Sequence, residues 1–409
     1  MSGNYYGRQR PNMRDNGYDP YYDAGYSAEP RMPRRRFFRS GVRRGSFDFV
    51  LFFVILVLLF FGIVMIFSSS YYTAMTSKKF NYDMYYFLKK QAMWAIIGTV
   101  FMIIASNIPY TFYKKTAKFI YGLAVLLLMA VLVVGQELNG SRRWLGVTES
   151  IGFQPSEFAK IAVIIFMAYY ISKHRKSMTT TRGFLKGVII LGIPVALIGA
   201  ANMSTALIVL IIGMVMMFVG VPNFITNALK TLLPIGAAGI ILMLKLPQFA
   251  YRQGRLDIWK DPFSDPLHDG YQTIQSLYAV ASGGLFGLGL GQSRQKTFIP
   301  EAHNDIIFAI ICEELGLVGA ALVIIIFMVL VWRGIRIALS AVDLFGCLVA
   351  TGISAMIGVQ VFLNIAVVTN TIPNTGVPLP FVSYGGSSLL FTMIAMGILL
   401  NVSKYRKIS

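Results

Sequence analysis

The sequence predicts an all-α integral membrane protein that crosses the bilayer about ten times. Of its 409 residues, 56% are hydrophobic and only 13% are charged, and the mean hydropathy is +0.62. A water-soluble globule of this length could not hide so much apolar surface, because much of its surface must face water. Apolar runs of ~20 residues, long enough to cross a bilayer, recur along most of the chain.

The first 46 residues differ in composition and are predicted to be a disordered, basic, cytoplasmic tail (residues 1–46). They are rich in Tyr, Gly, Pro and Arg and lack the aliphatic residues that build a core. An arginine cluster at the end of this tail is expected to lie on the anionic inner leaflet. The remaining residues, 47–409, are predicted to form one transmembrane domain.

Ten apolar runs are predicted to span the membrane. They centre on Val57, Thr99, Leu126, Ile164, Ile193, Ile211, Ala238, Val323, Gly358 and Met393. Basic residues gather in alternate loops, which the positive-inside rule assigns to the cytoplasm. Because the number of spans is even, both termini are predicted to be cytoplasmic, and a large extracytoplasmic loop, about 247–304, joins spans seven and eight.

The net charge of +19 has a membrane explanation. In a soluble protein it would suggest nucleic acid, but here Lys and Arg are expected to hold cytoplasmic loops against anionic lipid, so no nucleic-acid partner is predicted. Cys312 and Cys347 lie in apolar runs and predict no disulfide. There is no Walker, HExxH or GxSxG motif, and the three histidines are too scattered for a zinc site, so no metal ligands are predicted.

Asp305 is the acidic residue with the strongest claim to chemistry, because it stands where the large outer loop enters the eighth span. As a simple helix cap it would satisfy free backbone N–H groups, although Asn304 could fill that place instead. As a catalyst it could accept a proton from an attacking hydroxyl at the membrane surface. A helix N-terminus would then keep the carboxylate ionised. The local pattern leaves both interpretations open.

Basic residues in the predicted outer loops form a second candidate feature. They are Arg142, Arg143, Arg255, Arg294 and Lys296. Either they form a solvated basic face or they hold a pyrophosphate, which suits the bidentate fork of Arg.

Acidic residues near or within the spans need partners, because ions in hydrocarbon are expensive. Glu157 and Lys160 share one helix face at the start of the fourth span and can pair, either as a structural pair or as part of a site. At least one of Glu313 and Glu314 must point inward or to a partner.

The glycine-rich segment 283–291 superficially resembles a dinucleotide-binding loop, but it follows no predicted strand and lies outside the cell. Close backbone packing is the simpler account. Before it, Ile274, Leu277, Tyr278 and Ala281 have the spacing of an amphipathic helix that lies in the membrane interface.

Several segments, in the same order, resemble the SEDS family (shape, elongation, division and sporulation), the FtsW/RodA/SpoVE group. They are residues 139–144 (Asn-Gly-Ser-Arg-Arg-Trp), 154–160 (Gln-Pro-Ser-Glu-Phe-Ala-Lys), 261–263 (Asp-Pro-Phe), 270–276 (Gly-Tyr-Gln-Thr-Ile-Gln-Ser), 289–296 (Gly-Leu-Gly-Gln-Ser-Arg-Gln-Lys), 300–305 (Pro-Glu-Ala-His-Asn-Asp), 313–316 (Glu-Glu-Leu-Gly) and 378–388 (Pro-Leu-Pro-Phe-Val-Ser-Tyr-Gly-Gly-Ser-Ser). The first and fifth are more similar to the FtsW/SpoVE branch than to RodA.

The resemblance implies a ten-span glycosyltransferase of the bacterial cytoplasmic membrane. Its implied reaction is the polymerisation of lipid II into β-1,4-linked glycan strands on the outer face, for division, sporulation or cell shape. The implied partners are lipid II, membrane lipid, a class B penicillin-binding protein, and divisome or elongation proteins.

The resemblance also assigns site residues. The essential acidic residue of the family matches Asp305, which is expected to be the general base. The predicted substrate-binding residues are Arg143, Trp144, Glu157, Lys160, Arg255, Lys296, Ser383 and Ser387. No particular cofactor is predicted, although a divalent cation, Mg²⁺ or Mn²⁺, could help to neutralise the diphosphate. The chain departs from the family at residues 201–206, which lack a common acidic residue, and at Asn304, where Thr is common.

Two other functions compete with polymerisation. The protein could flip lipid II as a transporter without making a bond, or it could be a non-catalytic scaffold for a penicillin-binding protein. Polar groups gather in the outer loops, whereas a flippase needs polar groups that are reachable from both faces. The sequence therefore favours the polymerase.

Overall fold

The computed structural model describes residues 42–44, 47–138, 141–146, 152–231, 256–268 and 270–407. Within these ranges, nine helices are long and apolar enough to cross a membrane. They are α1 (Phe49–Thr76), α2 (Tyr86–Asn107), α3 (Tyr110–Val134), α4 (Pro155–His174), α5 (Thr181–Ala201), α6 (Met203–Gly220), α10 (Ile307–Ser340), α11 (Leu344–Val368) and α12 (Gly386–Ser403). The predicted all-α membrane fold is confirmed. The predicted seventh span, centred on Ala238, lies outside the described residues, as do residues 1–41 of the predicted tail.

Short elements connect these helices. They are β1 (Val42–Arg44), η1 (Lys78–Phe80), β2 (Gln136–Leu138), β3 (Ser141–Trp144), η2 (Ser177–Thr179), η3 (Pro262–Ser264), α9 (Tyr271–Ser282), η4 (Gln295–Thr297) and β4 (Tyr405–Lys407). Strands β2 and β3 pair antiparallel, with Leu138 opposite Ser141. This hairpin joins α3 to α4.

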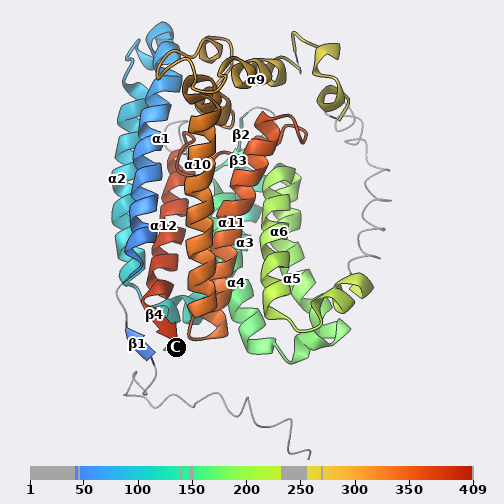
Figure 1. The fold of residues 1–409 in the computed structure, drawn as a ribbon. Coiled ribbons are helices and arrows are strands. Elements are labelled where there is room, and N and C mark those ends of the chain that lie inside the picture. Colours follow the sequence, from blue (N-terminus) through green and yellow to red (C-terminus); the bar gives the residue numbers. More distant parts are fainter. Residues whose placement is uncertain are drawn as a thin grey trace, which may run out of the picture. The chain divides into compact units, whose positions relative to one another are not determined.

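The central helices of the bundle are α4, α11 and α12 (Figure 1). Between 67% and 72% of their most apolar windows is buried, against 22% to 50% for the other six described spans. Outer helices can present apolar side chains to lipid all round, but a polar side chain is tolerated only where protein surrounds it. The central helices accordingly carry several buried polar side chains, including Glu157, Lys160, Asn364 and Asn401.

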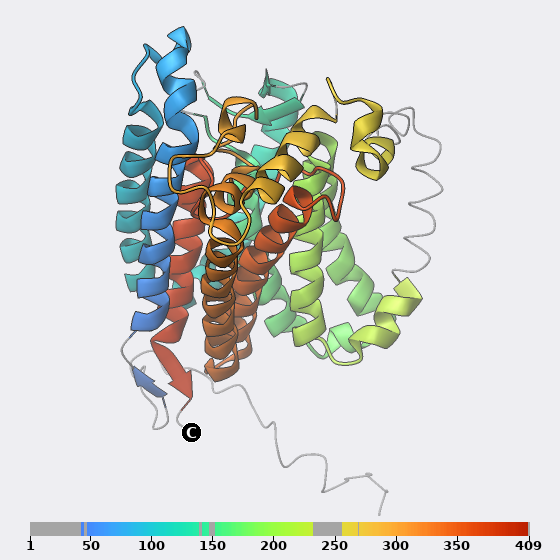
Figure 2. The same ribbon diagram turned by 45° about the horizontal axis from the view of Figure 1, so that its top comes forward.

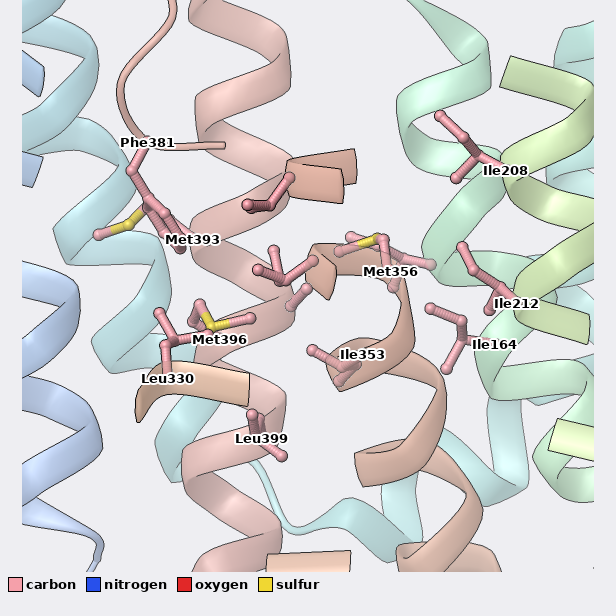
Figure 3. Close-up of a cluster of buried hydrophobic side chains, with 14 of the residues drawn as sticks. Ile164, Ile208, Ile212, Leu330, Ile353, Met356, Phe381, Met393, Met396 and Leu399 are labelled. Carbon is pink, nitrogen blue, oxygen red and sulfur yellow. The ribbon is translucent and has the colours of Figure 1, made fainter. Parts of the chain in front are cut away.

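The middle of the bundle is packed with apolar side chains (Figure 3). Ile164 of α4, Ile212 of α6 and Met356 of α11 lie on one side, while Met393 and Met396 of α12 lie on the other. All five are essentially buried. Methionine suits such a position, because its flexible thioether fills irregular gaps between helices. The buried side chains of Glu157, Lys160 and Asn364 lie towards the helix ends rather than at mid-depth.

Helix α10 is interrupted at Gly316, which has φ 67° and ψ −169°. The glycine-rich loop fills the break: Leu317 N donates to Gly284 O at 2.9 Å, and Leu288 N donates to Glu313 O at 2.9 Å. These bonds satisfy backbone groups that the break would otherwise leave unpaired in the bilayer. Close backbone packing of the segment 283–291 is thus confirmed.

Helix α9 lies across the ends of α10 and α11 (Figure 2). The predicted helix is confirmed, and its place in the membrane interface stays a prediction. Ile274 and Ala279 are buried against the protein, while Tyr278 and Ala281 are exposed. The helix is fixed by packing on α10, and Ser276 Oγ donates to Val368 O at the end of α11.

The beginning of α1 and the end of α12 lie at the same end of the bundle. Asp48 caps α1 by accepting a hydrogen bond from Leu51 N, and its own backbone N–H donates to Ser403 Oγ at 3.0 Å. The Asp48 carboxylate also accepts a bond from Arg333 Nη2 at 2.6 Å. Arg333 and the nearby Arg336 are basic, so the positive-inside rule predicts that this end of the bundle is the cytoplasmic one.

Candidate functional site

The segment that carries Asp305 is held by three hydrogen bonds to successive backbone carbonyls. Tyr384 N donates to His303 O at 2.9 Å, Ser383 Oγ donates to Asn304 O at 2.6 Å, and Asn364 Nδ2 donates to Asp305 O at 2.6 Å. The donors come from α11 and from the loop that precedes α12. The place of Asp305 is therefore set by long-range contacts, not only by the start of α10.

Neither capping expectation is correct. The N-cap of α10 is Ile306, and no side chain caps the helix there. Asn304 instead donates through Nδ2 to Glu301 Oε2 at 2.7 Å. Asp305 therefore does not cap α10, and its side chain is half-buried.

Burial raises the pKa of Asp305, and the neighbouring Glu301 carboxylate raises it further, while a backbone N–H lowers it. The net direction is upward, so the expected control of ionisation by the helix N-terminus is not what dominates here. A carboxyl with a raised pKa is a stronger base once ionised, which suits proton transfer near neutral pH.

Two described neighbours of Asp305 are an uncharged ring and a glycine. Burial lowers the pKa of His303 to about 4, so this ring is neutral at physiological pH. Its ring lies 4.2 Å from that of Phe87 and 5.5 Å from that of Tyr384, centroid to centroid. Gly376 covers the other side: its φ is 63°, and a Cβ there would lie 3.6 Å from Asp305 Oδ2.

Glu157 and Lys160 form an ion pair at the start of α4, as the sequence predicted. Lys160 Nζ lies 2.9 Å from Glu157 Oε1, and the two side chains are 3% and 6% exposed. Pro155 opens the helix in its first turn. The beginning of α4 contacts α12 through Phe158 and Phe391, whose ring centroids are 5.9 Å apart.

Arg143 and Trp144 lie on strand β3, next to the same end of the bundle. Arg143 Nε donates to Ala201 O at the end of α5, at 3.3 Å. The Trp144 ring covers Gly152, where a Cβ would come within 2.7 Å of Trp144 Cε3. Both residues are half-buried. The hairpin is thereby anchored over the bundle.

Figure 1 shows β3 and the start of α10 at one end of the bundle, opposite the cytoplasmic end defined by Asp48. Helix α12 connects the parts of this site. Its first turns touch α4 through Phe391, and the loop before it holds residues 303–305. The start of α4 and the segment 303–305 thus both contact α12 or the loop before it.

Lys296 has a buried partner. Its Nζ lies 3.3 Å from Glu314 Oε1, donates to Gly291 O at 2.5 Å, and lies 4.6 Å from the centre of the Tyr71 ring. Its side chain is 2% exposed. This pair accounts for the lysine without a phosphate, and contact of Lys296 with a diphosphate stays a prediction.

Both acidic residues of α10 are buried and paired. Glu313 accepts hydrogen bonds from Ser293 Oγ and from Arg294 N, the latter at 2.9 Å. Glu314 accepts one from Ser68 Oγ of α1 at 2.6 Å. The expectation that at least one of them has a partner is confirmed, and together they fasten the loop 288–297 to the membrane helices.

The remaining predicted residues differ in what they contact. Ser383 uses its hydroxyl within the protein, donating to Asn304 O and accepting from Leu379 N at 2.8 Å. Ser387 is buried in the first turn of α12. Arg255 lies outside the described residues. Among the described residues, no three His, Cys, Asp or Glu side chains gather as metal ligands, and the divalent cation stays a prediction.

The sequence reasoning missed two buried amides. Asn364 holds the Asp305 backbone, and Gln91 of α2 is fully buried with neither amide atom bonded within the described chain. Each lies within a membrane span, where a polar residue is itself a functional signal.

Comparison with known proteins shows which family has this architecture. The family model described as "Cell cycle protein", FTSW_RODA_SPOVE, matches residues 49–408. Stage V sporulation protein E of Bacillus subtilis (strain 168) is 43% identical, over 89% of this chain and 99% of that protein. "Probable peptidoglycan glycosyltransferase FtsW" of Geobacter sp. (strain M18) is 38% identical, over 88% and 97%.

Solved structures agree. A chain of the structure reported as "Structural coordination of polymerization and crosslinking by a peptidoglycan synthase complex" aligns with a TM-score of 0.72 at 25% identity, covering 88% of this chain and 98% of that one. The rod shape determining protein RodA of Thermus thermophilus aligns with a TM-score of 0.63 at 25% identity, covering 88% and 97%. Since the family model spans nearly all of the membrane domain, this chain belongs to the FtsW/RodA/SpoVE family.

Proposed function

We propose that this protein is a peptidoglycan glycosyltransferase that polymerises lipid II on the outer face of the bacterial cytoplasmic membrane. The observation that carries the proposal is Asp305, a half-buried carboxylate with a raised pKa, fixed at the non-cytoplasmic end of the bundle and free of any capping role. The names of its FtsW relatives support the same activity.

The proposed reaction forms one glycosidic bond and breaks one bond to phosphate. Asp305 accepts the proton of the acceptor's 4-hydroxyl, and the oxygen attacks the anomeric carbon of the donor. The bond from that carbon to the diphosphate breaks, and the polyprenyl diphosphate leaves with the electron pair. Attack from the opposite side inverts the anomeric centre and gives a β-1,4 link.

A single carboxylate can be enough for this chemistry. A glycosidase needs a second carboxyl group to protonate a poor leaving group, whereas a diphosphate leaves readily once its charge is neutralised. Arg143 is proposed to neutralise the diphosphate, because it is half-buried on β3, at the end of the bundle where α10 begins. Arg255 and a divalent cation are proposed to share this task.

The direct test is Asp305→Asn in purified, full-length protein supplied with labelled lipid II. Loss of one general base costs ~10²–10⁴-fold in rate, so strand synthesis is expected to fall by that factor. Asp343→Asn is the matched control: Asp343 caps α11 by accepting from Gly346 N, and Asn can still accept that bond. Unchanged strand synthesis by the Asp305 variant would remove the proposal.

The assay also separates the two competing functions. A lipid II flippase leaves no polymer in detergent, and the apolar packing around Met356 and Met393 in mid-bundle argues against a polar path through the described helices. A scaffold that only activates a penicillin-binding protein would support synthesis equally well with Asp305→Asn. Polymer made by the wild type but not by this variant is the result expected of a polymerase.

We further propose a class B penicillin-binding protein as the partner. The related structure couples polymerization to crosslinking within a peptidoglycan synthase complex, and crosslinking is the chemistry of a penicillin-binding protein. Co-purification of the two proteins from membranes, with crosslinked product from the mixture, is the expected result.

A further inference from the structure

Asn364 is a buried amide in the last two turns of α11. Its side chain uses both donor positions on backbone carbonyls: Nδ2 lies 2.6 Å from Asp305 O and 2.8 Å from Val377 O. The residue is 1% exposed, and Oδ1 has no hydrogen-bond partner among the described residues. The amide therefore bridges the segment of the proposed base and the loop that faces it.

The two bridged segments surround the Asp305 carboxylate. Val377 follows Gly376, whose positive φ lets the loop pass close to Asp305 Oδ2. Gly376 N is itself fixed by Asn374 Oδ1 at 3.1 Å, and Asn374 Nδ2 donates to Gln272 Oε1 of α9 at 3.2 Å. The Asn364 amide consequently holds both the backbone of Asp305 and the loop against its carboxylate.

Burying this amide in a membrane helix is costly, because Oδ1 accepts no hydrogen bond from the described part of the chain. A buried amide can also have a purely structural role, and Asn401 of α12 shows the same pattern of contacts. It is 1% exposed, Nδ2 donates to Ser106 O at 2.7 Å, and Oδ1 is unpartnered within the described chain. Asn364 differs because it holds the backbone of Asp305, whereas Asn401 joins helix ends at the other end of the bundle.

We infer that Asn364 is a positioning residue for the polymerisation reaction: it sets the distance and orientation of the Asp305 carboxylate relative to the loop around Gly376. The inference rests on the proposed function. It assigns Asn364 no contact with substrate, so the expected effect is on the chemical step and not on substrate binding.

The expected loss follows from how steeply catalysis depends on geometry. A misplacement of about 1 Å can cost ~10²-fold in rate, so Asn364→Ala is expected to lower kcat by ~10–100-fold. The KM for lipid II should stay within about threefold, because binding groups are untouched. Asn401→Ala removes the same kind of bond at the cytoplasmic end and should retain kcat, with a comparable decrease in melting temperature.

A second variant tests positioning without a change of shape. Asn364→Asp is isosteric, but its carboxylate cannot donate to Asp305 O, and its negative charge disfavours ionisation of Asp305. The other titratable neighbours of Asp305 are Glu301 and His303, which the variant leaves unchanged. Because the base must be ionised, the acidic limb of the kcat profile should move to higher pH, while Asn401→Asp should leave it in place.

The experiment measures initial rates of lipid II polymerisation by the full-length variants in detergent, across pH, beside their melting temperatures. A selective loss of kcat in Asn364→Ala with a shifted limb in Asn364→Asp supports the inference. Equal kcat in the Asn364→Ala and Asn401→Ala variants overturns it. Should Asn364→Ala fail to fold, an unshifted limb in Asn364→Asp overturns it alone. Full activity of Asp305→Asn is a different result, which removes the proposed function itself.

Discussion

The buried ion pair between Lys296 and Glu314 predicts that substitution of Lys296 lowers the stability of the protein and leaves its polymerisation activity nearly unchanged. Lys296→Met removes the ammonium and leaves the Glu314 carboxylate, 0% exposed, without its countercharge. Breaking a buried ion pair from one side typically costs 3–5 kcal/mol. Glu314 keeps hydrogen bonds from Ser68 Oγ and Ser293 N, so we expect the lower end of that range, about 3 kcal/mol in the free energy of unfolding.

Two comparisons isolate this effect. In Lys296→Met with Glu314→Gln, neither charge remains, and more than half of the lost stability should return. Lys89→Met breaks the Lys89–Asp83 pair, in which Lys89 is 67% exposed; such surface pairs contribute about 0–1 kcal/mol, so little should change.

Unfolding in detergent is measured by thermal or denaturant titration. Lipid II polymerisation is measured on the folded fraction. A structural pair predicts that stability falls and that activity per folded molecule changes little. The reasoning would be refuted by a Lys296→Met protein of normal stability that has lost polymerisation, because that outcome would place the ammonium on the diphosphate.

Three further predictions concern pH and backbone geometry. Burial raises the pKa of Asp305, so its ionisation destabilises the folded state as pH rises through that pKa; Asp305→Asn should raise the melting temperature at neutral pH, and the gain should vanish in acid. Burial lowers the pKa of His303 from 6.5 to about 4, so its contribution to stability is lost as pH falls between these values; His303→Gln should flatten the melting-temperature profile in that window, and an unchanged slope would contradict the assignment. Gly316→Ala should cost at least ~1–3 kcal/mol, measured by thermal unfolding, because φ is 67° and the loop backbone fills the space where a Cβ would stand.

The sequence alone determined the membrane fold and the identity of the acidic candidate. A run of ~20 apolar residues is suited to the hydrocarbon core of a lipid bilayer, where its backbone must form a helix. Nine of the ten predicted spans appear as helices in the described chain. The pairing of Glu157 with Lys160 was also predictable, because residues three apart share a helix face.

Only the tertiary structure decided what surrounds Asp305. Asn364, 59 positions away in the chain, holds the Asp305 carbonyl, and Ser383, 79 positions from Asn304, holds the carbonyl before it. No local pattern encodes contacts of such separation. The expected cap by Asp305 or Asn304 failed for the same reason: long-range bonds draw the carbonyls of residues 303–305 towards α11 and α12, so the helix begins later. Periodicity and composition report the solvent of each segment, whereas the orientation of one carboxylate depends on packing between segments that only the folded chain brings together.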